Sequence, residues 1–325
     1  MRSFTFAAPG TLEAASDEGR GGATYLAGGT TLVDLMKLEV LTPNRVADIN
    51  ALPLRGIRVD SDGLHIGALE RMSTVATHPA VRTAYPMVSR ALLASASQQL
   101  RNMASMGGNL LQRTRCGYYR DTAEPCNRRV PGSGCPAVNG ANRSHAILGT
   151  SDACAATHAS DVAVALVALD ASVRLRGAAG ERLVRLADFY RLPGNTPQLE
   201  HDLRPAELVT ELVIPPLPWA QRSGYLKVRD RQSYEFALCS AAVALDLAGR
   251  QVRDVRIAVG GVGTVPWRLP SVEAALRGAE LTEDSAGAAA KLAVAGARPL
   301  AHNGFKTTLL QRTLVRALLD VGGVL

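Results

Sequence analysis

The chain has 325 residues, of which 47% are hydrophobic and 4% aromatic, so it can bury the core of one large domain or of two to three ordinary ones. A net charge of +7 permits an acidic partner such as nucleic acid, but the arginines are spread along the chain without polybasic runs. No run of 18 apolar residues is present, and the apolar stretch at the start is too short for a secretory signal. We therefore expect no nucleic-acid partner, no membrane span and no export signal of the chain's own.

The first half of the chain mixes strands and helices. Residues 23–29 form a short apolar strand, residues 30–41 have helical spacing of their apolar side chains, and residues 45–50 form a second strand. This order predicts a parallel pair with a crossover helix. Residues 63–70 predict a further strand. Residues 73–101 predict two helices, because prolines interrupt a longer helical stretch.

The second half is richer in strands. Residues 171–190 predict a hairpin, residues 208–215 and 224–230 single strands, and residues 236–261 two strands joined by a turn. The tail, through residues 305–321, is helical. The chain is therefore expected to be an α+β protein with an antiparallel sheet and helices in its C-terminal part.

Two Gly-Gly elements are candidates for an anion cradle. LAGGTTL, residues 26–32, lies between a strand and a helix start, and SMGGNL, residues 105–110, borders a second apolar segment. Backbone N–H groups of adjacent glycines can converge on an anion, so the two elements could hold the two phosphates of one dinucleotide. A tight turn is the simpler interpretation of each. Neither element has the G-x-G-x-x-G spacing of a Rossmann domain.

A row of cations follows one predicted strand. Lys227, Arg229 and Arg231 lie on one side of it by the period of two. The row is either a solvated face or a set of cationic side chains that faces a cofactor, and the periodicity leaves both open.

Four of the five cysteines lie in one loop without hydrophobic periodicity. The gaps between Cys116, Cys126, Cys135 and Cys154 are 9, 8 and 18 residues, without the close pair that is typical of zinc sites or a common ferredoxin spacing. An iron–sulfur cluster, a zinc ion, two disulfides and unligated thiols all stay open. Cys239 lies in an apolar strand and is expected to be a buried small hydrophobe.

Arginines crowd this loop, and their positive charge favours deprotonated thiols. They are Arg113, Arg115, Arg120, Arg128, Arg129 and Arg143.

These motifs resemble a known family. LAGGTTL, MGGNL, HASDVAVALVALDA and YLKVRDRQSYEFAL occur in the order and spacing of the FAD-binding middle subunit of molybdenum hydroxylases, the group of xanthine dehydrogenase, carbon monoxide dehydrogenase and aldehyde oxidoreductase. The cysteine loop resembles an insertion in the flavin subunit of the periplasmic aldehyde oxidoreductase type, where it holds a [4Fe-4S] cluster. 4-Hydroxybenzoyl-CoA reductase also has an additional cluster in its flavin subunit.

The resemblance implies a PCMH or vanillyl-alcohol-oxidase-like two-subdomain fold for residues 1–175, divided near residue 55. It places a [4Fe-4S] loop at about 112–154 and a C-terminal domain at 176–325. Residues implied to bind FAD are Leu26, Ala27, Gly28, Gly29, Thr30, Thr31, Leu32, Ser105, Gly108, Asn109, Leu110, Asp161, Val209 and Lys227; those implied to ligate the cluster are Cys116, Cys126, Cys135 and Cys154. Thr31 stands where the family often has Asp or Asn.

The function implied is that of an electron-transfer subunit in a molybdenum-dependent aldehyde oxidoreductase. Its partners would be a large molybdenum subunit, a small [2Fe-2S] subunit and an external electron acceptor, and no residue of this chain would contact the aldehyde. The complex would be cytoplasmic, or periplasmic if exported on a partner's signal. Alternatives are the flavin subunit of a xanthine, carbon monoxide or 4-hydroxybenzoyl-CoA enzyme and, from another class, a zinc-containing nucleic-acid-binding module.

Overall fold

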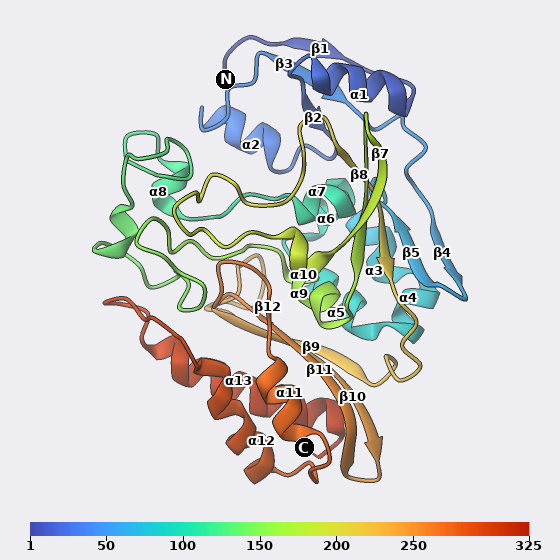
Figure 1. Cartoon of the computed structure of the whole chain (residues 1–325), viewed down its shortest axis with the longest axis vertical. Helices are drawn as coiled ribbons and strands as arrows, with labels where there is room; N and C mark the ends of the chain where they lie inside the picture. The colour runs from blue at the N-terminus through green and yellow to red at the C-terminus, as the bar shows by residue number, and fades with distance from the viewer. Residues whose placement is uncertain (325) are drawn as a thin grey trace.

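The computed structural model describes residues 1–324 and divides into three sheets with helices around them (Figure 1). The first sheet is parallel, in the order β1 (Thr5–Ala7), β3 (Arg45–Asp48), β2 (Thr24–Leu26). Helix α1 (Leu12–Arg20) joins β1 to β2, and α2 (Leu32–Lys37) joins β2 to β3. The predicted parallel pair with its crossover helix is β2–α2–β3, to which β1 adds a third strand.

The second sheet is antiparallel and has five strands. Its order is β4 (Ile57–Asp60), β5 (Gly63–Gly67), β8 (Leu208–Ile214), β6 (Ser172–Gly177) and β7 (Gly180–Arg185). The expected division at residue 175 therefore falls inside β6. Because β8 pairs with both β5 and β6, the chain changes sheet only between β8 and the next strand, some forty residues later than expected.

The stretch expected to form two helices holds four in the structure. They are α3 (Met72–Thr77), α4 (Pro79–Ala84), α5 (Pro86–Ala94) and α6 (Gln98–Met103). The two prolines stand at the first position of α4 and of α5, where a missing N–H costs nothing. Each proline thus starts a new helix, and the extra breaks shorten every helix of the segment.

The third sheet is antiparallel, in the order β12 (Trp267–Arg268), β11 (Gln251–Gly260), β10 (Cys239–Ala248), β9 (Ser223–Val228). The last helices, α11 (Pro270–Leu276), α12 (Glu283–Ala290) and α13 (Phe305–Gly322), lie beside this sheet at the lower end of the view in Figure 1. Alternate residues of β10 enter two different cores, so the sheet is buried on both faces.

Helix α9 (Asp161–Ala168) has every residue buried: it packs against β10 and β11 of the third sheet and shares one hydrophobic core with residues of the second sheet. The side chain of Ser160 caps it by accepting from the N–H of Ala163 (3.0 Å). Residues 112–159 form the cysteine loop, which holds only the short α8 (Gly117–Arg120) and a single 3-10 turn (Pro136–Val138). In Figure 1 it lies to one side of the sheets, next to α2.

Candidate functional site

A cavity of about 600 Å³ opens where β2 leads into α2. Residues 27–32 form one wall, and Ser105, Gly107, Gly108 and Val209 contribute to the remainder. The two Gly-Gly elements therefore face the same cavity, as their interpretation as one cradle requires.

The first wall is held open by its backbone. Gly29 has φ +73, in the left-handed region that favours glycine, and a Cβ on Gly28 would overlap the carbonyl oxygen of Met103. Asn50 donates to the carbonyl of Ala27 (2.8 Å). The turn is thereby fixed before any ligand binds.

The N–H groups of this turn are available to a ligand. Within residues 1–324, the backbone N–H groups of Gly28, Gly29, Thr30 and Thr31 donate to no protein acceptor. Four consecutive backbone donors that line a cavity and bond to no protein acceptor favour an anionic ligand, because successive N–H groups of this kind form an anion-binding concavity. The turn therefore fits a phosphate group such as the pyrophosphate of a dinucleotide cofactor.

The second wall is formed by α7 (Met106–Leu110). Ser105 caps this helix by accepting from the N–H of Gly108 (3.2 Å), and a Cβ on Gly107 would stand 3.0 Å from the Cβ of Ala68. Helix α7 and the turn after β5 thus approach closely only because position 107 is a glycine. Gly107 and Ala68 also line the cavity. Neither was predicted from the sequence, although Gly107 lies within SMGGNL.

Five of the residues expected to bind the cofactor are not in the cavity wall: Leu26, Asn109, Leu110, Asp161 and Lys227. Leu26 ends β2, Leu110 is fully buried in the core, and Asn109 is buried and accepts from the hydroxyl of Ser160 (2.5 Å). Asn109 therefore connects the second wall to the start of α9. Arg113, which was expected only as a cation beside the cysteines, lines the cavity.

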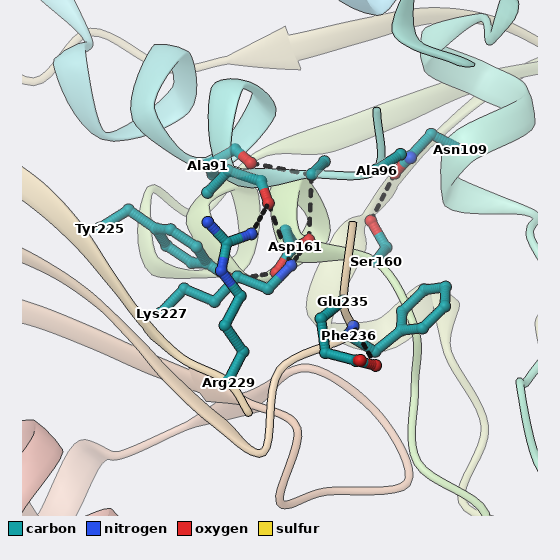
Figure 2. Close-up of polar contacts among 12 residues, drawn as sticks. Ala91, Ala96, Asn109, Ser160, Asp161, Tyr225, Lys227, Arg229, Glu235 and Phe236 are labelled. Atoms are coloured by element: carbon teal, nitrogen blue, oxygen red, sulfur yellow. Dashed lines mark hydrogen bonds and ion pairs between the residues drawn. The ribbon is translucent and has the colours of Figure 1, made fainter. Parts of the chain in front are cut away.

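Asp161 and Lys227 form a buried ion pair (Figure 2). Neither residue lines the cavity of the glycine turn. Their side chains are 7% and 3% exposed, and Lys227 Nζ lies 2.8 Å from Asp161 Oδ2. The hydroxyl of Tyr225 donates to Oδ1 (2.7 Å), and that of Ser95 donates to Oδ2 (3.0 Å). Lys227 also donates to the carbonyl of Ala94 (3.1 Å). The carboxylate charge is thus fully compensated inside the protein.

Asp161 lines a second cavity of about 190 Å³, between α9 and the turn after β9, which Cys116 and His145 also line. Of the predicted row of cations, Lys227 faces inward, whereas Arg231 is exposed and pairs with Glu235 (3.2 Å). The row is therefore neither wholly solvated nor wholly directed to one site.

The four clustered cysteines line one small cavity. All are free thiols in this structure, as is Cys239, which is fully buried as expected. Burial, followed by the charges of Cys154 and Cys126, raises the pKa of Cys116 to about 11, and the same causes raise the pKa of Cys135. Thiolates there need compensating charge or a metal, and residues 1–324 contain no compact group of three or more His, Cys, Asp or Glu side chains suited to a metal ion.

Two side chains direct nitrogen atoms at these sulfurs. Arg128 Nη2 donates to Cys154 Sγ (3.6 Å), and His145 Nε2 lies 3.2 Å from Cys116 Sγ. Burial, followed by the charge of Lys306, lowers the pKa of His145 to about 4, so its ring is neutral at pH 7. Arg128 therefore supplies a positive charge beside the four cysteines.

The sequence and the fold have counterparts among known proteins. Residues 2–217 match the family model "FAD binding domain in molybdopterin dehydrogenase", and residues 224–321 match the "CO dehydrogenase flavoprotein C-terminal domain". The two matches meet where the chain passes from the second sheet to the third. None of the helices in the described part of the chain is long and apolar enough to cross a bilayer.

Relatives cover the chain from end to end. The aldehyde oxidoreductase FAD-binding subunit PaoB of Escherichia coli is 48% identical over 98% of both chains, and the glyceraldehyde dehydrogenase medium chain of Sulfolobus acidocaldarius is 30% identical over 82% of this chain and 78% of its own. Carbon monoxide dehydrogenase of Hydrogenophaga pseudoflava has the same fold, with a TM-score of 0.77 at 24% identity over 99% of this chain and 98% of that one. The chain belongs to the FAD-binding middle subunits of the molybdenum hydroxylases and is a subunit of an oxidoreductase.

Proposed function

We propose that this chain is the FAD- and [4Fe-4S]-containing electron-transfer subunit of a heterotrimeric molybdenum-dependent aldehyde oxidoreductase. The observation that carries the proposal is the pair of cavities, one with four free backbone N–H groups and one lined by four cysteines. The 48% identity to a subunit named for aldehyde oxidoreductase supports the choice of aldehydes over xanthine, carbon monoxide or 4-hydroxybenzoyl-CoA as substrates of the complex.

FAD supplies two-electron redox chemistry when bound, and this chain's residues hold and orient it. The turn at residues 26–32 would bind the pyrophosphate through its free N–H groups, with Ser105 and Gly108 on the opposite wall. Val209 would close the cavity with its buried side chain. The remaining proposed contacts, Asn109 and Leu110, would act through the backbone or by holding α7, because their side chains point into the protein.

The flavin end of FAD would lie toward Asp161 and Lys227. The support is indirect: Ser160, which precedes Asp161, is bonded to Asn109 of α7, so the two regions share one hydrogen-bonded connection. The ion pair itself is internally satisfied, so we assign it the role of shaping the site rather than that of donating charge to the cofactor.

A [4Fe-4S] cluster would be held by Cys116, Cys126, Cys135 and Cys154. Each cysteine of a cubane cluster binds its own iron, so the four sulfurs surround the cluster instead of meeting at one ion. Four cysteines around a common cavity, without a compact three-residue group in the described chain, fit this arrangement better than a single zinc ion. Free thiols in place of disulfides are consistent with ligation.

Partners and location complete the proposal. A large molybdenum subunit and a small [2Fe-2S] subunit would deliver electrons to this chain, and an external acceptor would remove them. The complex would be cytoplasmic, or periplasmic if a partner carries the export signal. The zinc nucleic-acid module is set aside, because both family matches belong to flavoproteins of molybdenum enzymes.

The test is to copurify the complex from cells that express all three subunits and to record its visible spectrum, iron content and flavin content. We expect flavin bands, an iron–sulfur shoulder and about four irons per chain beyond those of the small subunit. Aldehydes, but not xanthine or carbon monoxide, should bleach the flavin. Zinc in place of iron, or two disulfides by mass spectrometry, would refute the cluster; absence of FAD would refute the whole proposal.

A further inference from the structure

Two buried side chains approach cysteine sulfurs on the proposed cluster cavity. Arg128 Nη2 donates to Cys154 Sγ at 3.6 Å, and His145 Nε2 lies 3.2 Å from Cys116 Sγ. Both side chains come from the cysteine loop itself, and both residues are more than nine-tenths buried. A buried guanidinium and a buried imidazole at sulfur need a reason, because simple packing would favour apolar residues there.

Each of the two is fixed in place by contacts that do not involve cysteine. Arg128 Nη1 pairs with the partly buried Glu200 at 2.7 Å, so its guanidinium has one defined orientation. The backbone of His145 is held by Asn303, which donates to its carbonyl at 3.2 Å, and by its own N–H bond to Asn142 (2.9 Å). The two donors are therefore positioned before a cluster binds.

We propose that Arg128 and His145 are positioning residues that donate hydrogen bonds to the thiolates of Cys154 and Cys116 and thereby set the reduction potential of the cluster. The inference rests on the proposed [4Fe-4S] cluster. Reduction adds one electron to the cluster and breaks no bond to cysteine, so the reduced state carries one more negative charge. A donor at a ligating sulfur stabilises that extra charge and raises the potential.

Nitrogen donation also fixes the histidine tautomer. A metal-bound thiolate has no proton, so only the tautomer with hydrogen on Nε2 can bond to Cys116. The buried Nδ1 of His145, which has no partner among the described residues, would then be the unprotonated nitrogen. As an unprotonated nitrogen, Nδ1 is an acceptor without a donor. The other tautomer would bury an Nδ1–H donor without an acceptor and would also lose the bond from Nε2 to Cys116, so it is the more costly of the two.

The test uses matched substitutions in the intact three-subunit complex. H145M and R128M remove the donors with little change in side-chain length, whereas H145Q and R128K keep a donor. R143M is the control, because Arg143 lies in the same loop but pairs with Asp230 (2.8 Å) on the surface. Iron and FAD are counted for each variant, and the midpoint potential of the cluster is read by EPR during a dithionite titration.

We expect both methionine variants to keep FAD. In each, the equilibrium constant for reduction of the cluster should fall about tenfold, which lowers the midpoint potential by about 59 mV for one electron. H145Q and R128K should lie closer to the unsubstituted complex, and R143M should match it. If H145M and R128M retain iron and have the same midpoint potential as the unsubstituted complex, this inference is overturned and the proposed function is not. A complex without a [4Fe-4S] signal would overturn the proposed function with it.

A second measurement covers variants that lose their iron. In the unsubstituted complex labelled with ¹⁵N-histidine, pulsed EPR of the reduced cluster should show coupling to a labelled ring nitrogen. Absence of that coupling would overturn the role of His145 without any substitution.

Discussion

Replacing Lys227 by Met should be among the most destabilising single changes in this chain. The substitution removes the cation that pairs with the buried Asp161, which then keeps two hydroxyl donors, from Tyr225 and Ser95. Breaking a buried pair by removing one partner costs about 3–5 kcal/mol. Because domains are stable by only about 5–15 kcal/mol, this change would consume a large part of the free energy of unfolding.

A double-mutant cycle measures the interaction free energy between Asp161 and Lys227 apart from their contacts with other residues. Asp161→Asn alone leaves an ammonium group against the carbonyl of Ala94, so it should also be strongly destabilising. The double variant buries no unpaired charge, and its loss should be smaller than the sum of the two by roughly 2 kcal/mol or more. Arg231→Met is the control, because its exposed pair with Glu235 is worth at most about 1 kcal/mol.

The assay is thermal and urea unfolding of the purified complex, with FAD release followed by fluorescence. We expect Lys227→Met to unfold at lower urea and to release FAD only as it unfolds. If the losses in the free energy of unfolding of the two single variants add up to that of the double variant, Asp161 and Lys227 are not coupled. A variant of unchanged stability that lacks FAD would refute the structural role and place Lys227 in direct contact with the cofactor.

Three further changes probe the two cavities. Gly28→Ala would overlap the carbonyl of Met103, so FAD per chain should fall several-fold, whereas Gly10→Ala, which meets nothing within 4 Å, should leave it unchanged; equal FAD in both would contradict the cradle. Cys126→Ser should lower iron by up to about four per chain and expose the loop to protease while FAD stays. Lys306→Met, which removes a buried cation bonded to two backbone carbonyls, should loosen the same loop and lower iron without loss of FAD; intact iron and unchanged proteolysis would show that the loop does not depend on it.

The sequence predicted elements whose signal is local. The alternation of strand and helix around the first Gly-Gly turn, the antiparallel C-terminal sheet and its terminal helices were all predicted, because periodicity and glycine placement report on each separately. Helix α1 was missed because its residues, LEAASDEGR, have only one buried side chain, Ala15. The apolar side chains of this segment, those of Leu12, Ala14 and Ala15, are too few and too small to stand out as a hydrophobic pattern.

What could not be predicted depends on long-range pairing. Strand β8 joins β5, which lies some 140 residues earlier in the chain, and no local pattern indicates such a partner. The same holds for the cysteines, whose spacing left four chemistries open, although the fold brings all four to one cavity. The partner of Lys227 could not be predicted either, because the period of the strand indicates the side on which Lys227 lies but not that the carboxylate of Asp161 lies opposite it.

The cysteine loop is connected to both halves of the molecule, and the strength of each connection decides what loss of the cluster would do. On the cofactor side, Arg115 and Arg120, which flank Cys116, bond to Asp34 of α2 at 3.0 and 2.8 Å. These side chains are partly exposed, so each pair is worth at most about 1 kcal/mol. On the other side, Asn303 is fully buried and donates to the loop backbone, and such bonds are costly to leave unmade. A disordered loop should therefore disturb the C-terminal half more than the FAD cavity, which is why FAD is expected to stay when the cluster is lost.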